Sequence, residues 1–173
     1  MIESILYKKL KNNQVQCQTC HHFCVLENNQ IGKCGVRQNI NGKLQVLNYG
    51  KIVASSIDPI EKKPLYRFLP NTQTYSIASV GCNFKCLHCQ NYSLSCPEEW
   101  SDEGSREIPG QVLSHEKIIS EAINNNCPSV SYTYTEPTIF LEFALESMKL
   151  AHKNNLKNIW VSNGYFSEQT LNL

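Results

Sequence analysis

The sequence lacks an excess of charge of either sign, and it lacks any long apolar run. Its 173 residues carry 16 Lys and Arg against 15 Asp and Glu, so the formal net charge is +1. We therefore expect neither a basic nucleic-acid-binding surface nor a highly charged disordered chain. No apolar run approaches the roughly 18 residues that a membrane span requires, and residues 1–10 have too short an apolar core for a secretion signal. These absences predict a cytoplasmic protein that binds neither nucleic acid nor membrane.

Internal repeats of roughly 20 to 50 residues and low-complexity tracts are also absent. The length allows one domain, or one domain with a small appendage. Cysteine, in contrast, is abundant, with nine residues. In a reducing compartment such a number indicates metal binding or redox chemistry rather than disulfides. Seven cysteines fall into two groups, Cys17, Cys20, Cys24 and Cys34, and then Cys82, Cys86 and Cys89, while Cys96 and Cys127 stand alone.

The distribution of residue types predicts three regions. Residues 1–56 form a small Cys-rich appendage, in which 43–54 read as short strands around the turn signals Asn41-Gly42 and Tyr49-Gly50. Residues 57–73 contain three prolines and are expected to be a linker. Residues 74–173 alternate between strand and helix patterns. We therefore expect an α/β protein with a β-rich appendage at its amino-terminal end.

The third region predicts three strands, at 75–80, 130–134 and 159–162, separated by helices at 114–124 and 137–154, with the start of another at 167–173. This order is typical of parallel strands joined by crossovers. Working residues in such folds lie at the carboxyl ends of the strands. The loop at Cys82, the segment Thr135-Glu136-Pro137 and the pair Asn163-Gly164 are therefore expected to converge on one site.

The middle cysteines supply three thiolates within eight residues. Soft thiolates select zinc or iron–sulfur centres. A structural zinc site takes four protein ligands, whereas three thiolates on a [4Fe-4S] cluster leave one iron open for chemistry. The alternative is that Cys96 provides a fourth ligand for a ferredoxin-like or zinc site.

The run Cys82-x-x-x-Cys86-x-x-Cys89, with Phe84 inside it and His88 before the last cysteine, resembles the cluster loop of the radical S-adenosylmethionine (SAM) superfamily. The resemblance implies a [4Fe-4S] cluster on these three cysteines, with SAM chelated at the open iron. It also implies reductive cleavage of SAM to methionine and a 5′-deoxyadenosyl radical, with Phe84 and His88 close to the cofactors.

A narrower resemblance covers essentially the whole chain. The run Asp58-Pro59-Ile60-Glu61-Lys62-Lys63-Pro64-Leu65, then Phe68-Leu69-Pro70, and the segment 32–37 are similar to the radical SAM enzymes of the AmmeMemoRadiSam system, which are related to pyruvate formate-lyase-activating enzyme. This resemblance implies a flavodoxin or ferredoxin as electron donor. It also implies a glycyl-radical-activating type of reaction, with a protein as substrate.

The second and third strand ends resemble SAM-binding segments of the superfamily. Thr135 and Glu136 stand where a Gly-Gly-Glu-Pro segment binds the SAM amino group, and a carboxylate beside an ammonium forms a strong charge-assisted hydrogen bond. The alternative is that Glu136 caps the following helix. Asn163 is a candidate for a hydrogen bond to SAM or substrate, although Asn-Gly is also a common turn. Tyr132, Tyr134 and Phe84 either pack around adenine or belong to the core.

The amino-terminal cysteines Cys17, Cys20, Cys24 and Cys34 provide a full set of four thiolates for zinc or a second iron–sulfur cluster. An appendage of this size needs such a staple to fold, so we expect it to bind metal independently of the later loop. The alternative is a set of buried thiols. Cys17-x-x-Cys20-His21 also matches a haem attachment pattern, but that attachment is extracytoplasmic and leaves Cys24 and Cys34 without a role.

The main hypothesis is a radical SAM enzyme with a partial (β/α) barrel of about three βα units. The rival is a non-catalytic binding module stapled by zinc. Relatives in the superfamily close a six-strand partial barrel, so three strands correspond to its first half. We therefore expect a truncated or split product whose third strand is an exposed edge, and which binds SAM weakly without its missing half.

Overall fold

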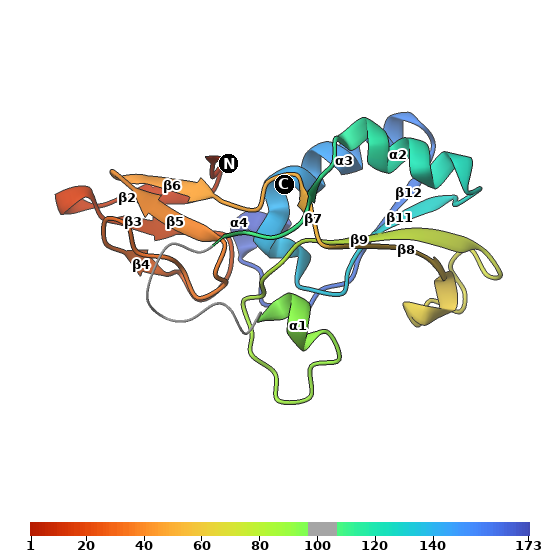
Figure 1. Ribbon diagram of the computed structural model, residues 1–173, viewed down its shortest axis with the longest axis horizontal. Coiled ribbons are helices and arrows are strands. Elements are labelled where there is room, and N and C mark those ends of the chain that lie inside the picture. Colours follow the sequence, from red (N-terminus) through yellow and green to blue (C-terminus); the bar gives the residue numbers. More distant parts are fainter. Residues whose placement is uncertain (97–106) are drawn as a thin grey trace.

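The structure is a computed structural model that describes residues 1–96 and 107–173. Figure 1 shows two parts side by side. Small antiparallel sheets lie at the amino-terminal end, and a larger sheet covered by helices is formed by the rest of the chain. No helix in the described residues is long and apolar enough to cross a membrane.

The amino-terminal part consists of short strands in two antiparallel sheets, ordered β1-β6-β5 and β2-β3-β4. The elements are β1 (Ile2–Glu3), β2 (Tyr7–Lys9), η1 (Lys11–Asn13), β3 (Val15–Cys17), β4 (Val25–Leu26), β5 (Arg37–Ile40) and β6 (Lys43–Val46). Asn41 and Gly42 join β5 to β6 with φ angles of 52° and 77°, a left-handed conformation that these two residue types accept. The turn predicted at Asn41-Gly42 is confirmed.

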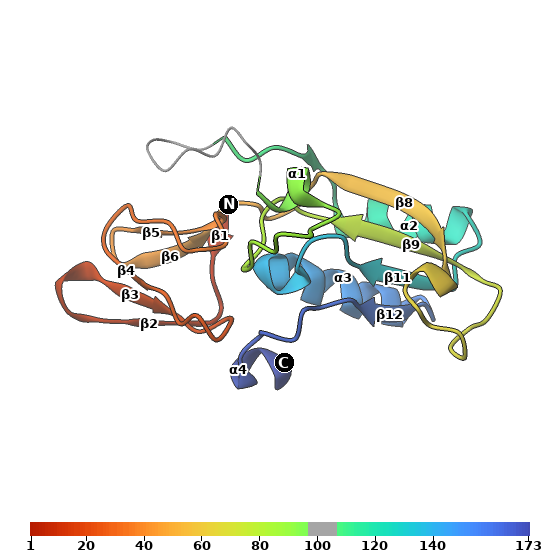
Figure 2. The same cartoon turned by 90° about the horizontal axis from the view of Figure 1, so that it is seen from below.

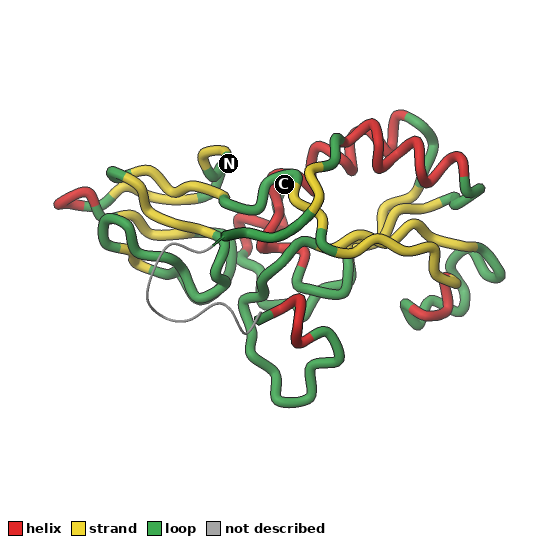
Figure 3. Tube along the Cα trace, in the orientation of Figure 1, coloured by secondary structure: helices red, strands yellow, loops and turns green. Residues whose placement is uncertain are grey.

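The larger sheet has the order β12-β11-β9-β8, in which β9, β11 and β12 are parallel and β8 is antiparallel to β9. Its strands are β8 (Ala54–Pro59), β9 (Gln73–Ala78), β11 (Ser129–Tyr132) and β12 (Lys157–Trp160). Two helices, α2 (His115–Asn124) and α3 (Leu141–Lys153), cover one face of this sheet (Figure 1 and Figure 3). The predicted alternation of parallel strands and helices is confirmed, whereas its membership of a partial barrel remains a prediction.

Successive side chains of a strand point to opposite faces of the sheet, and in β9 and β11 the two faces differ in residue type. Tyr75 and Ile77 on β9, with Val130 and Tyr132 on β11, belong to the apolar core shared with α2 and α3. The alternate positions on the same strands are small and polar, and all are buried: Thr74, Ser76, Ser129 and Ser131. Tyr132 is fully buried, so of the two alternatives, packing around adenine or belonging to the core, the structure shows the core.

The expected linker at 57–73 begins differently in the structure. Ile57 pairs with Tyr75 and Asp58 pairs with Thr74, so residues 57–59 are the end of strand β8. Pro59 is tolerated because β8 is the edge of the sheet, where a missing N–H group breaks no ladder. The single turn η2 (Ile60–Lys62) follows, with Ile60 fully buried. Pro59 therefore ends an edge strand, and the connection to β9 begins after it and not at residue 57.

The remaining elements are short. They are β7 (Lys51–Ile52), paired with β10 (Gln111–Val112), and α1 (Tyr92–Ser95), η3 (Pro137–Phe140) and α4 (Glu168–Leu171). Ser114 caps α2 by accepting a hydrogen bond from the Lys117 N–H, as predicted. The third strand was expected at 159–162, but β12 ends at Trp160, and the chain turns toward Glu136 at Ser162.

The amino-terminal part packs against the rest of the chain. The Ser167 and Thr170 hydroxyls donate to the carbonyls of Gln18 and Thr19, and Cys20 forms a β-bridge with Phe166, so α4 lies against the amino-terminal part (Figure 2). Val36 also belongs to the large core. The amino-terminal part therefore shares hydrogen bonds and core packing with the sheet domain, whereas its independent binding of metal stays a prediction.

Candidate functional site

The loop after β9 carries the three middle cysteines. Gly81, with φ of 100°, turns the chain out of the sheet, and its N–H donates to the Leu94 carbonyl 2.9 Å away. Cys82 and Cys89 are half-buried, while Cys86 is exposed. All three line one cavity of about 430 Å³. The end of β9, the turn at Gly81 and its hydrogen bond to Leu94 together place the three thiols at one cavity.

The other walls of this cavity come from the two later strand ends. Residues 133–136 follow β11, and residues 161–163 follow β12, and both segments line the cavity with the cysteines. The Asn91 side-chain amide, at the end of the cysteine loop, donates to the Tyr134 carbonyl at 2.9 Å. The convergence expected from the parallel strand order is what the structure shows.

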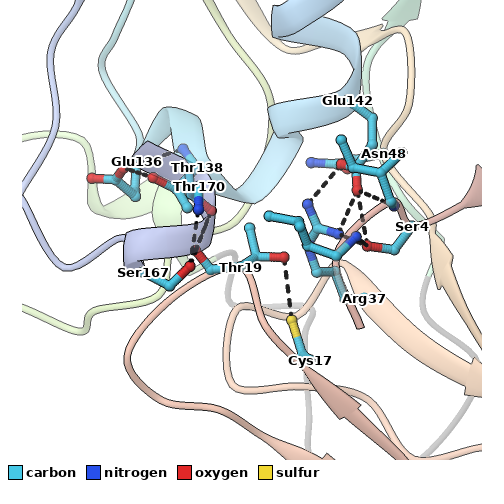
Figure 4. Close-up of polar contacts among 12 residues, drawn as sticks. Ser4, Cys17, Thr19, Arg37, Asn48, Glu136, Thr138, Glu142, Ser167 and Thr170 are labelled. Atoms are coloured by element: carbon cyan, nitrogen blue, oxygen red, sulfur yellow. Dashed lines mark hydrogen bonds and ion pairs between the residues drawn. The ribbon is translucent and has the colours of Figure 1, made fainter. Parts of the chain in front are cut away.

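Glu136 links the second strand end to the third. Its buried carboxylate accepts hydrogen bonds from the Thr138 N–H at 3.1 Å, from the Ser162 hydroxyl at 2.9 Å and from the Asn163 N–H at 2.7 Å. Figure 4 shows the contact with Thr138. The contact with the Thr138 N–H caps η3, so the capping interpretation is confirmed. Glu136 nevertheless also lines the cavity.

Thr135 and Asn163 also make contacts inside the chain. The Thr135 hydroxyl donates to the Ser79 carbonyl at 2.7 Å, which ties the second strand end to the first. The Asn163 side-chain amide donates to the Asn83 side-chain oxygen at 2.8 Å, which ties the third strand end to the cysteine loop. Both residues line the cavity. Their polar contacts fix the relative positions of the three loops.

The two remaining predicted residues of the loop differ in position. Phe84 lines the cavity, and its ring lies 5.0 Å from that of Tyr165 and 6.0 Å from that of His22, measured between centroids. His88 is exposed and does not line the cavity, so the expected contact of His88 with the cofactors is not what the structure shows. Cys96, the alternative fourth ligand, follows α1 and is also not a lining residue.

Sequence reasoning did not assign a site role to Asp58, Lys62 and Lys63. Both lysines line the cavity, and their Nζ atoms each lie 2.7 Å from an Asp58 carboxylate oxygen. Burial alone would raise the pKa of Asp58, but hydrogen bonds from Lys62, Lys63 and Tyr134 hold it well below its usual range. The sequence does show two adjacent lysines, but the prolines on either side of them indicated a linker and not the wall of a site.

The four amino-terminal cysteines line a second, small cavity. This cavity measures about 20 Å³ and is also lined by His22 and Asn83. His22 Nε2 lies 2.8 Å from the carbonyl oxygen of Asn83, a residue of the cysteine loop. Across the described residues, no three His, Cys, Asp or Glu side chains already converge as the ligands of one ion. The four thiols line one cavity, but in the described residues their sulfur atoms do not lie close enough together to bind one ion.

Burial is the largest influence on the pKa of three of these thiols. It raises the pKa of Cys82, against the opposing effect of the N–H groups of Phe84 and Glu136. It also raises the pKa of Cys20, and it raises the pKa of Cys34 to about 12. Because thiolates bind metal and thiols do not, a bound cation would have to supply the charge that stabilises the deprotonated form.

Comparison with known proteins places this geometry in a family. Residues 76–173 match the model of the Radical SAM superfamily. The chain is 44% identical over 172 residues to "Uncharacterized protein MJ0808" of Methanocaldococcus jannaschii, which covers 99% of this chain and 50% of that protein. It is 23% identical over 171 residues to "Uncharacterized protein MJ0674" of the same organism, covering 94% and 43%. No solved structure matches the chain.

The chain spans about half the length of the curated relatives that it matches. The family match itself begins within β9 and extends over the cysteine loop and both later strand ends. These are the segments that line the 430 Å³ cavity. Because the matched residues cover more than half of the chain and include its three convergent loops, this protein belongs to the radical SAM superfamily.

Proposed function

We propose that this chain holds a [4Fe-4S] cluster on Cys82, Cys86 and Cys89 and binds SAM in the adjoining cavity. Membership of the superfamily implies these two cofactors. Together they supply one-electron cleavage of SAM to methionine and a 5′-deoxyadenosyl radical. The observation that carries the proposal is that three thiols, and no fourth cysteine of the described residues, line the cavity formed by the strand ends.

The donor set and the cavity fit these cofactors. Three thiolates are soft ligands of the kind that hold iron–sulfur clusters. The Phe84 N–H lies 3.5 Å from the Cys82 sulfur and can donate to a cluster-bound thiolate. The cavity volume of about 430 Å³ falls in the range of roughly 300–1,000 Å³ typical of small-ligand sites.

The strand ends would bind and orient SAM. We assign the carboxylate of Glu136 to the SAM amino group, because it lies on the cavity wall and its Oε2 atom accepts two hydrogen bonds whereas Oε1 accepts three. Thr135 and Asn163 position this wall through Ser79 and Asn83. Phe84 and Tyr134 contribute aromatic surface to the same cavity.

The source of the electron and the type of reaction belong to the same proposal. Cys86 is exposed and the neighbouring Leu87 has a relative exposure of 105%, so the cysteine loop reaches the protein surface. A flavodoxin or ferredoxin can therefore approach the cluster ligands directly. By resemblance to activating enzymes, we propose a glycine residue of a protein substrate as the hydrogen donor.

The test is SAM cleavage by the chain loaded with iron and sulfide under anaerobic conditions. With dithionite as reductant, we expect 5′-deoxyadenosine to form in proportion to the cluster content, measured by chromatography. The control is the same preparation of Cys86→Ala, which should form none because one cluster ligand is lost. A colourless protein that retains zinc at these cysteines and leaves SAM intact would favour the rival non-catalytic binding module.

We also propose a separate metal at Cys17, Cys20, Cys24 and Cys34. The support is that all four thiols, two of them from the segment 20–24, line one cavity. The cavity of about 20 Å³ has room for about one water-sized body. This size favours a single zinc ion over a second iron–sulfur cluster, with side-chain rotation bringing the four sulfurs onto the ion.

Metal analysis of the full chain tests this second site. The double variant Cys17→Ser/Cys20→Ser is expected to lose one equivalent of zinc while keeping the iron of the cysteine loop, because two of four tetrahedral ligands are removed. Cys127→Ser is the matched control, since Cys127 is buried in the large core away from both cavities. Equal zinc contents in the wild type and the double variant would contradict the proposal.

A further inference from the structure

The segment after β8 adds positive charge to the wall of the SAM cavity. Lys62 and Lys63, at the end of η2, line this cavity together with the three cluster cysteines. They differ in accessibility, since the Lys63 side chain is 3% exposed and the Lys62 side chain is 57% exposed. Only Lys62 therefore has an ammonium group that a ligand in the cavity can reach.

Asp58 forms an ion pair with both lysines. Its Oδ1 atom lies 2.7 Å from Lys62 Nζ, and its Oδ2 atom lies 2.7 Å from Lys63 Nζ and accepts a hydrogen bond from the Tyr134 hydroxyl. The Lys63 ammonium also lies 4.7 Å from the centroid of the Tyr134 ring, a cation–π distance. Lys63 and Tyr134 thus fix the carboxylate that positions Lys62.

The charges of this group do not balance. One carboxylate neutralises one of two ammonium groups, and the buried Lys63 depends on it, because an unpaired buried cation is costly. Lys62 is then the surplus cation: it donates to Asp58, its ammonium lies 5.6 Å from the centroid of the Tyr134 ring, and in the described part of the chain it forms no ion pair with a second carboxylate. The other carboxylate of the cavity wall, Glu136, already accepts hydrogen bonds from three residues.

We infer that Lys62 binds a carboxylate group of a molecule that occupies this cavity, and that Asp58, Lys63 and Tyr134 position it. The inference rests on the proposed function for the identity of the cavity as a SAM site. The carboxylate has two possible sources, the methionine moiety of SAM and a second, carboxylate-bearing substrate. In both, an ammonium paired with a carboxylate forms a charge-assisted hydrogen bond.

The first arm of the test measures ligand binding to the cluster-loaded chain by calorimetry. If SAM supplies the carboxylate, Lys62→Met weakens SAM binding by about tenfold or more, whereas binding of decarboxylated SAM is unchanged. Lys62→Arg should retain SAM binding, because the charge is kept. Lys149→Met is the matched control, since Lys149 is exposed on α3 and does not line the cavity.

The second arm needs neither cluster nor SAM. Acylation of lysines is followed by peptide mass spectrometry, with acetate replacing chloride at constant ionic strength. Acetate should slow the acylation of Lys62 and leave that of Lys149 unchanged. Protection by acetate, together with unchanged SAM binding in Lys62→Met, assigns the carboxylate to a second substrate.

Two results would overturn the inference. One is unchanged SAM binding in Lys62→Met together with no protection of Lys62 by acetate. The other is an equal loss of binding for SAM and decarboxylated SAM, again without protection, because the effect would then not depend on a carboxylate. Failure of the wild-type chain to bind SAM at all would instead contradict the proposed function, and the acetate arm would still decide the role of Lys62.

Discussion

Replacing any one of Cys82, Cys86 or Cys89 with Ala is expected to abolish the SAM-responsive iron–sulfur cluster. All three thiols line the same cavity, and two thiolates do not hold a four-iron cluster of this kind in place. The measurement is electron paramagnetic resonance of the reduced protein with and without SAM, together with the iron content. We expect the SAM-dependent change in the wild-type signal to be absent from each variant.

The isolated cysteines are the controls for this prediction. Cys96→Ala and Cys127→Ala should keep both the iron and the response to SAM, because neither residue lines the cavity. Cys127 is buried in the large core, and Cys96 follows α1. A cluster that survives Cys86→Ala but disappears in Cys96→Ala would mean that Cys96, and not Cys86, is a cluster ligand, which contradicts the assignment of the cluster to the three cysteines of the loop.

Local signals in the sequence predicted the elements that local interactions determine. Ser114 accepts from the third N–H after it, and this contact starts α2 where the sequence indicates. The parallel order followed from alternating strand and helix patterns, and it places the three strand ends at one cavity. The cysteine loop was recognisable because its spacing alone brings three thiols together. These features depend on neighbours within a few residues or on strand order.

Contacts between distant residues could not be read in the same way. Strand β8 pairs with β9 from Ala54 opposite Ala78 to Pro59 opposite Gln73. Because the last residue of β8 is a proline, the residue types in this segment favoured a linker over a strand. The site role of Lys62 and Lys63 depends on the partner Asp58 and on Tyr134 from the second strand end. A charged pair has the same sequence appearance whether it is solvated or held at a cavity.

The amino-terminal part shows the same limit for packing. Its cysteine spacing predicted a metal-binding appendage, but the spacing contains no information about the surface against which that appendage packs. In the structure, Arg37 of β5 is buried against Glu142 of α3, at 2.7 Å between Nη2 and Oε2. Ser4 donates to the same carboxylate at 2.9 Å (Figure 4). The two parts are therefore joined by a charged contact inside the protein.

Replacing Arg37 with Leu is expected to lower the free energy of unfolding of the full chain by about 3–5 kcal/mol, because it leaves a buried carboxylate without its partner. The two side chains of this pair are 3% and 2% exposed. Arg37 also donates to Ser4 at 2.6 Å, so a second buried polar group loses a contact. Urea unfolding followed by circular dichroism measures the change.

Two further variants show whether the pair itself is responsible. The double variant Arg37→Leu/Glu142→Leu should recover much of the loss, since it removes both charges and leaves an apolar contact in their place. Lys117→Met breaks an exposed pair with Glu121 on α2 and should cost no more than about 1 kcal/mol. A double variant as unstable as Arg37→Leu would show that the loss comes from the shape of the Arg37 side chain and not from the stranded charge of Glu142.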